Sequence, residues 1–241
     1  MVSGFQYGGI WSNNMGLTID AKTSQASPTY DVEFVEVPGL DGDLAIDNKR
    51  LMPFTYPIHV FLKDDVDVHA AATRISQWLK SDVRYKDLLL SWDSNYIYKA
   101  IFYEQFDIQD ILPKFGKISL NFKCHPVKYL AEGMTPQNIN NGSSLINPEL
   151  RSAKPLIKIV GSGDITLKNN GVDWLILRAV DGYISVDSNA QLVYKDSYNQ
   201  FDKMMATLSP LFPQLKPGEN LITFTGNVTS VEITPRWEAT I

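Results

Sequence analysis

Cysteine is almost absent from this 241-residue sequence, which contains a single one, Cys124. One cysteine cannot form a disulfide within the chain, so no covalent cross-link contributes to the fold. Cys124 falls on the apolar side of a predicted strand. The expected role of a cysteine in such a position is that of a small buried hydrophobic residue.

Long apolar runs and an excess of positive charge are also missing. No stretch approaches the ~20 apolar residues that cross a bilayer, and residues 1–7 lack the basic and apolar regions of a signal peptide. We therefore expect a chain without a membrane segment that folds in a cytoplasm. A balance of 22 Lys and Arg against 27 Asp and Glu gives a net charge of −5. This charge argues against a protein that grips nucleic-acid phosphates.

Histidine is scarce, and the residue patterns of common active sites do not occur. His59, His69 and His125 are far apart in the sequence and match no metal-ligand spacing. The sequence also lacks a Gly-x-Ser-x-Gly nucleophile turn. These observations predict that the protein is not an enzyme and uses no metal or cofactor.

The stretch from residue 117 to residue 124 alternates strictly between polar and apolar side chains. Ile118, Leu120, Phe122 and Cys124 share one side, which is the period-two pattern of a half-buried strand. Pro126 should end this strand, because proline cannot donate to a sheet ladder. We therefore expect this strand to be the last one of a first domain.

A helix is expected at about residues 67–80. Asp67 is a suitable N-cap, and the apolar residues that follow it recur at the spacing of one helix face. Strands are expected at 30–37, with a bulge near 34–35, and at 54–62, where Pro57 suggests a sheet edge. Residues 37–44 have the composition of a loop.

Two further strands are expected at 88–92 and 96–106. The second is apolar on both sides, with Tyr96 and Tyr98 on one and Ile97 and Tyr103 on the other. Such a strand is covered on both sides within its domain or is buried against a neighbouring subunit.

The second half of the sequence reads as all-β. Residues 131–153 are polar and rich in turn formers, so they are expected to form a connector. Beyond them, short strands are separated by turn signals at 161–163, 181–182 and 226–227, and one or two helical turns are expected at 201–208. The predicted fold is an α+β domain with one helix at 1–130, the connector, and an antiparallel β-sandwich at 154–241.

Several short segments resemble one known family when they are taken in order. They are FQYGG (5–9), MGL (15–17), EVPGLDG (36–42), WL (78–79), YIYKA (96–100), FGKISLNFKCHP (115–126), ISVD (184–187), Tyr194, FPQLKPGEN (212–220) and ITPR (233–236). In order and spacing they resemble the distal tail protein of long-tailed, non-contractile bacteriophages, a baseplate hub protein of the siphophage tail tip.

The resemblance implies a structural protein of the virion tail tip that is assembled in the host cytoplasm. Its first domain would form a homo-hexameric ring, and its second would be a galectin-like sandwich. The ring would bind the tail tube protein, a tail-associated lysin or tip protein, and receptor-binding or other baseplate proteins. DNA would pass through the lumen during ejection without specific binding.

Proposed ring-contact or lumen residues follow from the loop and from the two-sided strand. They are Pro38, Gly39, Asp41, Gly42, Asp43, Tyr96, Tyr98 and Tyr103. The acidic loop suits a lumen that DNA slides past, although a plain surface turn is the alternative interpretation of residues 37–44.

A carbohydrate-binding module of a cell-surface or tail protein is the alternative function, because the second half looks like a lectin-type sandwich. Galectin recognition uses a His-x-Asn-x-Arg strand, and no histidine lies beyond His125. We therefore expect no glycan binding through that groove, and we interpret Trp237 as an apolar residue at a strand end.

Overall fold

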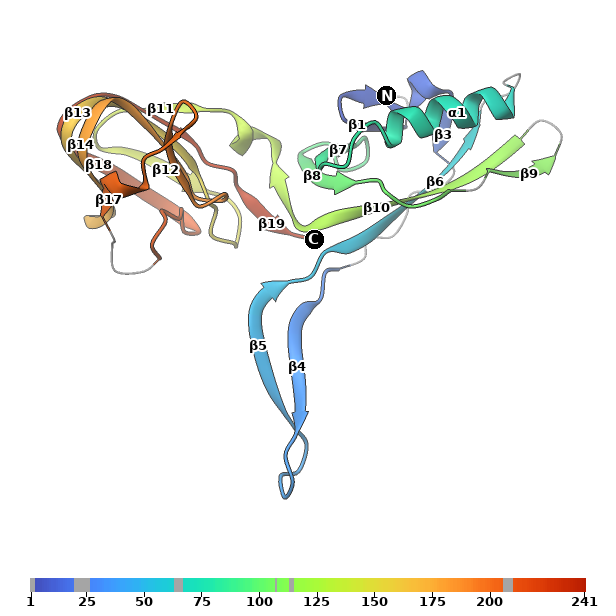
Figure 1. The fold of residues 1–241 in the computed structure, drawn as a ribbon, viewed down its shortest axis with the longest axis horizontal. Coiled ribbons are helices and arrows are strands. Elements are labelled where there is room, and N and C mark those ends of the chain that lie inside the picture. Colours follow the sequence, from blue (N-terminus) through green and yellow to red (C-terminus); the bar gives the residue numbers. More distant parts are fainter. Residues whose placement is uncertain (1–2, 20–26, 63–66, 107, 113–114, 206–209) are drawn as a thin grey trace. The chain divides into compact units, whose positions relative to one another are not determined.

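The computed structural model describes residues 3–19, 27–62, 67–106, 108–112, 115–205 and 210–241. The chain divides into two compact units (Figure 1). The first comprises residues 1–128 and 240–241, and the second comprises residues 129–239. Each unit has its own hydrophobic core.

A nine-stranded sheet forms most of the first unit. Its main path runs in the order β2-β1-β7-β8-β10-β6-β3, and β9 and β19 pair with β10. The strands are β1 (Phe5–Tyr7), β2 (Ile10–Trp11), β3 (Leu17–Ile19), β6 (Phe54–Leu62), β7 (Lys86–Leu90), β8 (Tyr96–Ile101), β9 (Ile108–Leu112), β10 (Phe115–Leu130) and β19 (Glu238–Thr240). A short 3-10 helix, η1 (Ser12–Met15), links β2 to β3.

The predicted helix is confirmed as α1 (Val68–Leu79), which lies on one face of this sheet (Figure 1). The Asp67 carboxylate caps it by accepting hydrogen bonds from the backbone N–H groups of His69, at 2.9 Å, and Ala70, at 3.4 Å. The buried side of the helix carries Ala71, Ile75, Trp78 and Leu79.

The alternating strand is also confirmed, but its predicted end at Pro126 is wrong. Leu120, Phe122 and Cys124 are fully buried, and β10 continues through Pro126 to Leu130. The pairing of β10 with β6 ends at Cys124, so the missing N–H of Pro126 removes no hydrogen bond to β6.

The edge position expected for Pro57 is only half correct. Its strand, β6, lies between β10 and β3, and among the described residues the pairing with β3 covers Val60–Leu62 of β6. Pro57 faces Asn121 of β10, in a part of β6 that has no partner on its other side within the described residues. A proline is therefore tolerated in a strand that is internal at its other end.

The second unit is built on an eight-stranded antiparallel sheet in the order β11-β18-β13-β14-β15-β16, with β12 paired to β18 and β17 to β14. Its strands are β11 (Gln137–Ile139), β12 (Ser143–Asn147), β13 (Leu156–Asn169), β14 (Val172–Asp187), β15 (Leu192–Lys195), β16 (Tyr198–Asn199), β17 (Met204–Met205) and β18 (Gly218–Thr234).

The strand breaks predicted at the turn signals 161–163, 181–182 and 226–227 are wrong. Each of these turn signals lies inside one long strand, in β13, β14 and β18 respectively. The three signals are neighbours across the sheet, because Ser162 pairs with Asp181 on one side and with Asn227 on the other. Both ends of each long strand contribute to one core, so the sheet folds over its own interior.

Glycine is needed where the sheet bends, because the backbones of neighbouring strands come close together there. A Cβ atom on Gly161 would lie 2.3 Å from the carbonyl oxygen of Asn227, and one on Gly226 would lie 2.3 Å from that of Asp164. Gly226 also has a φ of 104°. The glycines therefore allow a close backbone approach instead of closing tight turns.

The expected connector at 131–153 is largely structured. It contains the 3-10 helix η2 (Ala131–Met134) and the strands β11 and β12, both paired with β18. Of the helical turns expected at 201–208, the structure has η3 (Phe201–Lys203) followed by β17, and residues 206–208 lie outside the described ones. Trp237 is buried in the core of the second unit, as expected for an apolar strand-end residue.

Candidate functional site

The most unusual surface of the first unit is a two-stranded hairpin formed by β4 (Tyr30–Glu36) and β5 (Asp43–Leu51). Among the strands that the structure describes, these two pair only with each other, and they extend away from the large sheet (Figure 1). No residue of either strand is buried. The hairpin therefore lacks the cover that usually stabilises a two-stranded ribbon.

Large apolar side chains are exposed along the hairpin. Phe34 is 67% exposed, and Leu44 is 50% exposed on the opposite strand. Other exposed apolar residues of the hairpin and its tip are Tyr30, Val37, Leu40 and Ile46. Contiguous apolar surface of this kind marks contact sites on soluble proteins.

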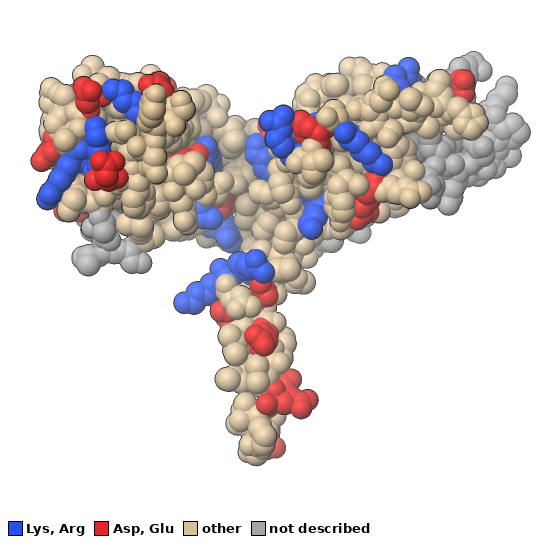
Figure 2. Space-filling model, viewed as in Figure 1, with Lys and Arg blue, Asp and Glu red and all other residues tan. Residues whose placement is uncertain are grey.

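The hairpin is also strongly acidic. Residues 31–48 contain six Asp and Glu and no Lys or Arg. Figure 2 shows basic side chains gathered at the base of the hairpin and acidic ones along its length. At the base, Arg50 Nε lies 2.5 Å from Asp31 Oδ2, and this hydrogen bond holds the pKa of Asp31 below its usual value.

The structure brings five of the predicted site residues together at the hairpin tip. Pro38, Gly39, Asp41 and Gly42 lie in the loop between the strands, and Asp43 begins β5, all of them exposed. The backbone N–H of Leu40 donates to the carbonyl oxygen of Val37 at 3.1 Å, which closes the turn. The loop is thus the end of a projecting element.

The three predicted tyrosines have different surroundings. Tyr98 is fully buried in the core, and its hydroxyl donates to Asp93 Oδ2 at 2.5 Å. Burial, followed by that hydrogen bond, raises its pKa. Tyr96 is half-buried beneath the ammonium group of Lys128, 4.0 Å from the ring centroid. Tyr103 is 54% exposed. Tyr98 therefore serves the core and is not accessible to a second subunit in this structure.

A second apolar surface lies on the sheet face that α1 does not cover. It consists of Ile97 and Ile101 of β8, which are half-buried, together with Tyr103 and Lys123. Lys123 Nζ lies 5.7 Å from the centroid of the Tyr103 ring. We call these four residues the outer patch. Lys123 adds a positive charge to this apolar surface, and the Glu104 carboxylate, which is hydrogen-bonded to Tyr103, adds a negative one.

Sequence reasoning missed the apolar residues of the hairpin. Strand β5 was not predicted, although Leu44 and Ile46 alternate with polar or small neighbours at period two. The bulge expected near 34–35 lies instead between Tyr30 and Val32, where the pairing register shifts. The period-two signal and the Pro-Gly and Asp-Gly pairs could together have identified the hairpin.

The described residues contain no group of three or more His, Cys, Asp or Glu side chains placed to hold a metal ion. His125 packs against Tyr85, with ring centroids 4.1 Å apart, and its pKa is lowered by burial and then by Lys99. Cys124 is buried, and burial raises the pKa of its thiol to about 12. That thiol is therefore not a ready nucleophile.

Within the described residues, the helices are all too short or too polar to span a bilayer.

Comparison with models of known protein families gives no match, and no curated protein sequence matches the chain. A solved structure does match along nearly the whole length. It is the Dit (gp 19.1) protein of phage SPP1, described as a paradigm of the hub adsorption apparatus in phages that infect Gram-positive bacteria. The TM-score is 0.72 at 17% sequence identity, with 97% of this chain and 98% of that one covered. This similarity shows a shared fold.

Proposed function

We propose that this chain is a structural component of a phage tail tip. Six copies would form a ring that joins the tail tube to the tip and leaves a channel for DNA. Two observations support the proposal: the fold shared with the SPP1 Dit protein, and the ordered segments that resemble distal tail proteins. The second unit would then be the galectin-like domain of that family.

The uncovered hairpin is the observation that most directly supports assembly of several copies into a ring. A lone two-stranded hairpin is at best marginally stable in water, and this one exposes both of its faces. Burying the exposed aromatic and aliphatic side chains against another subunit would supply the missing stabilisation. The hairpin therefore requires a partner surface.

The outer patch has the properties that such a partner surface needs. It offers Ile97, Ile101 and Tyr103 to the apolar side chains of the hairpin, and Lys123 to its carboxylates. A closed ring requires two different patches on each subunit, one meeting the other on the next subunit. The hairpin and the outer patch are different surfaces of one unit, as such a ring requires.

The acidic hairpin also agrees with a channel that DNA passes without being held. Six carboxylates without a basic residue repel phosphates if the tip, with Asp41 and Asp43, borders the lumen. Weak attraction favours sliding, whereas a basic lining would retain DNA.

The remaining partners are those of a ring placed between two assemblies. The tail tube protein would bind one side, a tail-associated lysin or tip protein the other, and receptor-binding or other baseplate proteins the periphery. The chain would reside in the virion tail tip after assembly in the host cytoplasm. None of these roles requires catalysis or a cofactor.

Light scattering of the full chain tests the proposal. We expect the mass of a hexamer, and we expect the Phe34→Ser/Leu44→Ser variant to be monomeric with an unchanged circular dichroism spectrum. Val172, which is 70% exposed in the second unit, provides the matched control, because Val172→Ser should leave the hexamer intact. A monomeric wild-type chain, or a hexamer in the double variant, would contradict the proposal.

A carbohydrate-binding module is the alternative function. It gives no reason for the hairpin, because a free-standing module would leave that apolar surface in water. A monomer that binds glycans would favour this alternative.

A further inference from the structure

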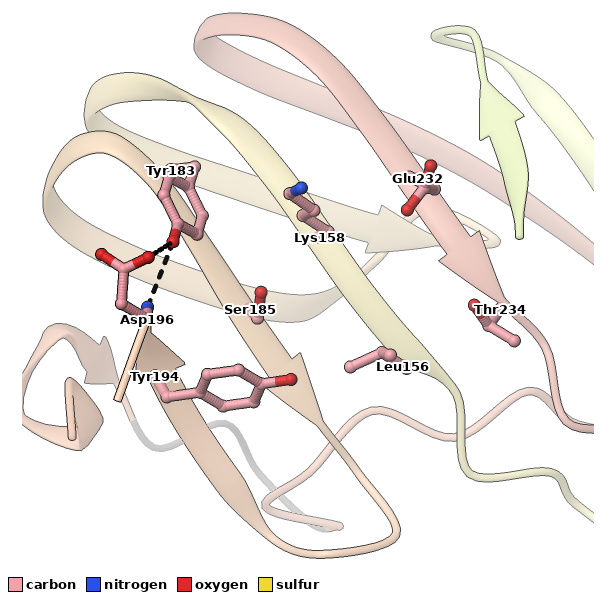
Figure 3. Close-up of a pocket in the computed structure, with 8 residues that line it drawn as sticks. All are labelled: Leu156, Lys158, Tyr183, Ser185, Tyr194, Asp196, Glu232 and Thr234. Atoms are coloured by element: carbon pink, nitrogen blue, oxygen red, sulfur yellow. Dashed lines mark hydrogen bonds between the residues drawn. The ribbon is translucent and has the colours of Figure 1, made fainter. Parts of the chain in front are cut away.

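A hollow on the solvent-facing side of the second unit's sheet has no role in the ring proposed above. It is a cavity of about 290 Å³ that is lined from β13, β14, β18 and the end of β15 (Figure 3). This volume lies near the lower end of ligand pockets, which span roughly 300–1,000 Å³. The cavity therefore has room for one small ring-shaped group.

The sheet register places four polar or aromatic side chains in one row across this hollow. Lys158 pairs with Ser185 on one side and with Glu232 on the other, and Ser185 pairs in turn with Tyr194. Directly paired side chains on one face of a sheet lie about 5 Å apart. The apolar core lies on the other face, with Ile157 and Ile159.

The polar groups of the hollow are open to a ligand. Ser185 and Thr234 are only 7% and 9% exposed, yet their hydroxyls make no hydrogen bond within the described part of the chain. Over the same described residues, the Glu232 carboxylate has no hydrogen-bond or ion-pair partner. The ammonium group of Lys158 lies above the Tyr183 ring, 5.4 Å from its centroid. None of these groups is among the fully buried side-chain atoms that lack a partner, so they can be reached from the hollow.

The aromatic side of the hollow is held in place. The Tyr183 hydroxyl donates to the Asp196 carboxylate and accepts from the Asp196 backbone N–H at 3.1 Å. Figure 3 shows Tyr183 and Tyr194 on one side of the hollow and Glu232 and Thr234 on the other. An aromatic wall thus faces a set of hydrogen-bonding groups.

We propose that this hollow binds an uncharged saccharide. A pyranose ring has an apolar C–H face, which the Tyr194 ring would receive, and an edge of hydroxyls, each a donor and an acceptor. Glu232 would accept from these hydroxyls, Lys158 would donate to them, and Ser185 would do both.

Charge argues against an anionic ligand. The hollow is lined by one ammonium group, Lys158, and two carboxylates, Asp196 and Glu232, and the Lys195 ammonium lies 5.6 Å from the centroid of the Tyr183 ring. A phosphate or a carboxylated sugar would be repelled by Glu232, whereas a neutral hydroxyl can use both signs of charge. The second unit contains no histidine, so this mode of binding differs from the His-x-Asn-x-Arg arrangement.

Saturation-transfer NMR on the full chain tests this proposal. The probes are methyl glycosides of the common neutral hexoses and N-acetylhexosamines, with the methyl glycosides of sialic acid and glucuronic acid as anionic comparisons. We expect saturation transfer to at least one neutral glycoside and none to the anionic ones. Transfer to no neutral glycoside, or only to the anionic ones, would overturn the proposal.

Variants then locate the binding. Glu232→Gln keeps the shape of the side chain and removes its charge, and Tyr194→Ala removes one aromatic wall. We expect each change to weaken binding of the glycoside at least about tenfold. Glu219→Gln and Tyr198→Ala are matched controls outside the hollow in the same unit, and they should leave the affinity unchanged. Binding that survives both Glu232→Gln and Tyr194→Ala would place the sugar elsewhere and refute the assignment.

Discussion

Trp78 holds α1, β1 and the large sheet together through one side chain. Its indole Nε1 donates to the carbonyl oxygen of Tyr7 at 3.1 Å, and its ring stacks on Phe5 with centroids 5.8 Å apart. Both contacts lie in the core of the first unit, where a cavity cannot be filled by water at low cost.

Truncation of this side chain should therefore be severe. We expect Trp78→Ala to lower the free energy of unfolding by ~3–5 kcal/mol, most of the stability of a small domain. Trp78→Phe keeps a six-membered aromatic ring and loses the pyrrole ring with its hydrogen bond, so it should cost clearly less. Thermal unfolding measures both, and an unchanged melting temperature in Trp78→Ala would mean that the apolar side of α1 does not face a core.

The pair formed by Asp187 and Arg236 makes the second unit sensitive to acid. The two guanidinium nitrogens lie 2.7 and 3.0 Å from the two carboxylate oxygens. Burial alone would raise the pKa of Asp187, but the hydrogen bonds from Arg236 and from the Ala190 N–H hold it below its usual value. Because the pKa of Asp187 is lower in the folded state than in the unfolded state, the pair stabilises the fold fully above pH ~4. This contribution is lost as the pH falls through the folded-state pKa.

Asp187→Asn should lower the free energy of unfolding at pH 7 by about 1–3 kcal/mol, because it leaves Arg236 half-paired. The difference from the wild type should shrink as pH falls below ~4, where the wild-type carboxylate is protonated as well. Thermal unfolding between neutral and strongly acid pH measures this. Asp173→Asn is the control, since its ion pair with Lys168 is exposed and should contribute little at any pH. A difference that is the same at every pH would refute the assignment.

At the scale of elements, the three long strands of the second unit depend on backbone contact at their common bend. Gly161→Ala places a methyl group against the Asn227 carbonyl, which is backbone and cannot rotate away. We expect a loss of about 3 kcal/mol of stability. Gly163→Ala, two residues away, meets no atom within 4 Å and should cost only about 1 kcal/mol through its φ of 77°. Equal effects in the two variants would mean that close approach does not determine the bend.

At the scale of the whole molecule, the ring contacts proposed here all lie in the first unit. Residues 1–130 should therefore form a hexamer, and residues 129–239 a folded monomer. Light scattering on the two fragments measures this, and the reverse outcome would place the ring in the second unit. A fragment that begins at residue 154 should fold poorly, because it lacks β11 and β12, which complete the second sheet.

The candidate site could be predicted only in part. The turn residues at 38–43 identify the hairpin tip, because proline, glycine and aspartate have distinctive backbone preferences. The exposure of Phe34 and Leu44 could not be foreseen, since an apolar residue in a strand is usually buried. The same reasoning placed Tyr98 at a contact, whereas its side chain lies in the core.

The sequence alone determined the helix, its cap and the alternation of β10, because helix and strand periodicity depend only on neighbouring residues. The tertiary structure decided what the glycines of the second unit do. Gly161, Gly182 and Gly226 each have the local signature of a turn, but Gly161 and Gly182 pair directly, and Gly226 lies beside the Asn227 that pairs with Ser162. A glycine that permits a turn and a glycine that permits a close backbone approach look the same along the chain. They differ only once the neighbouring strand is in place.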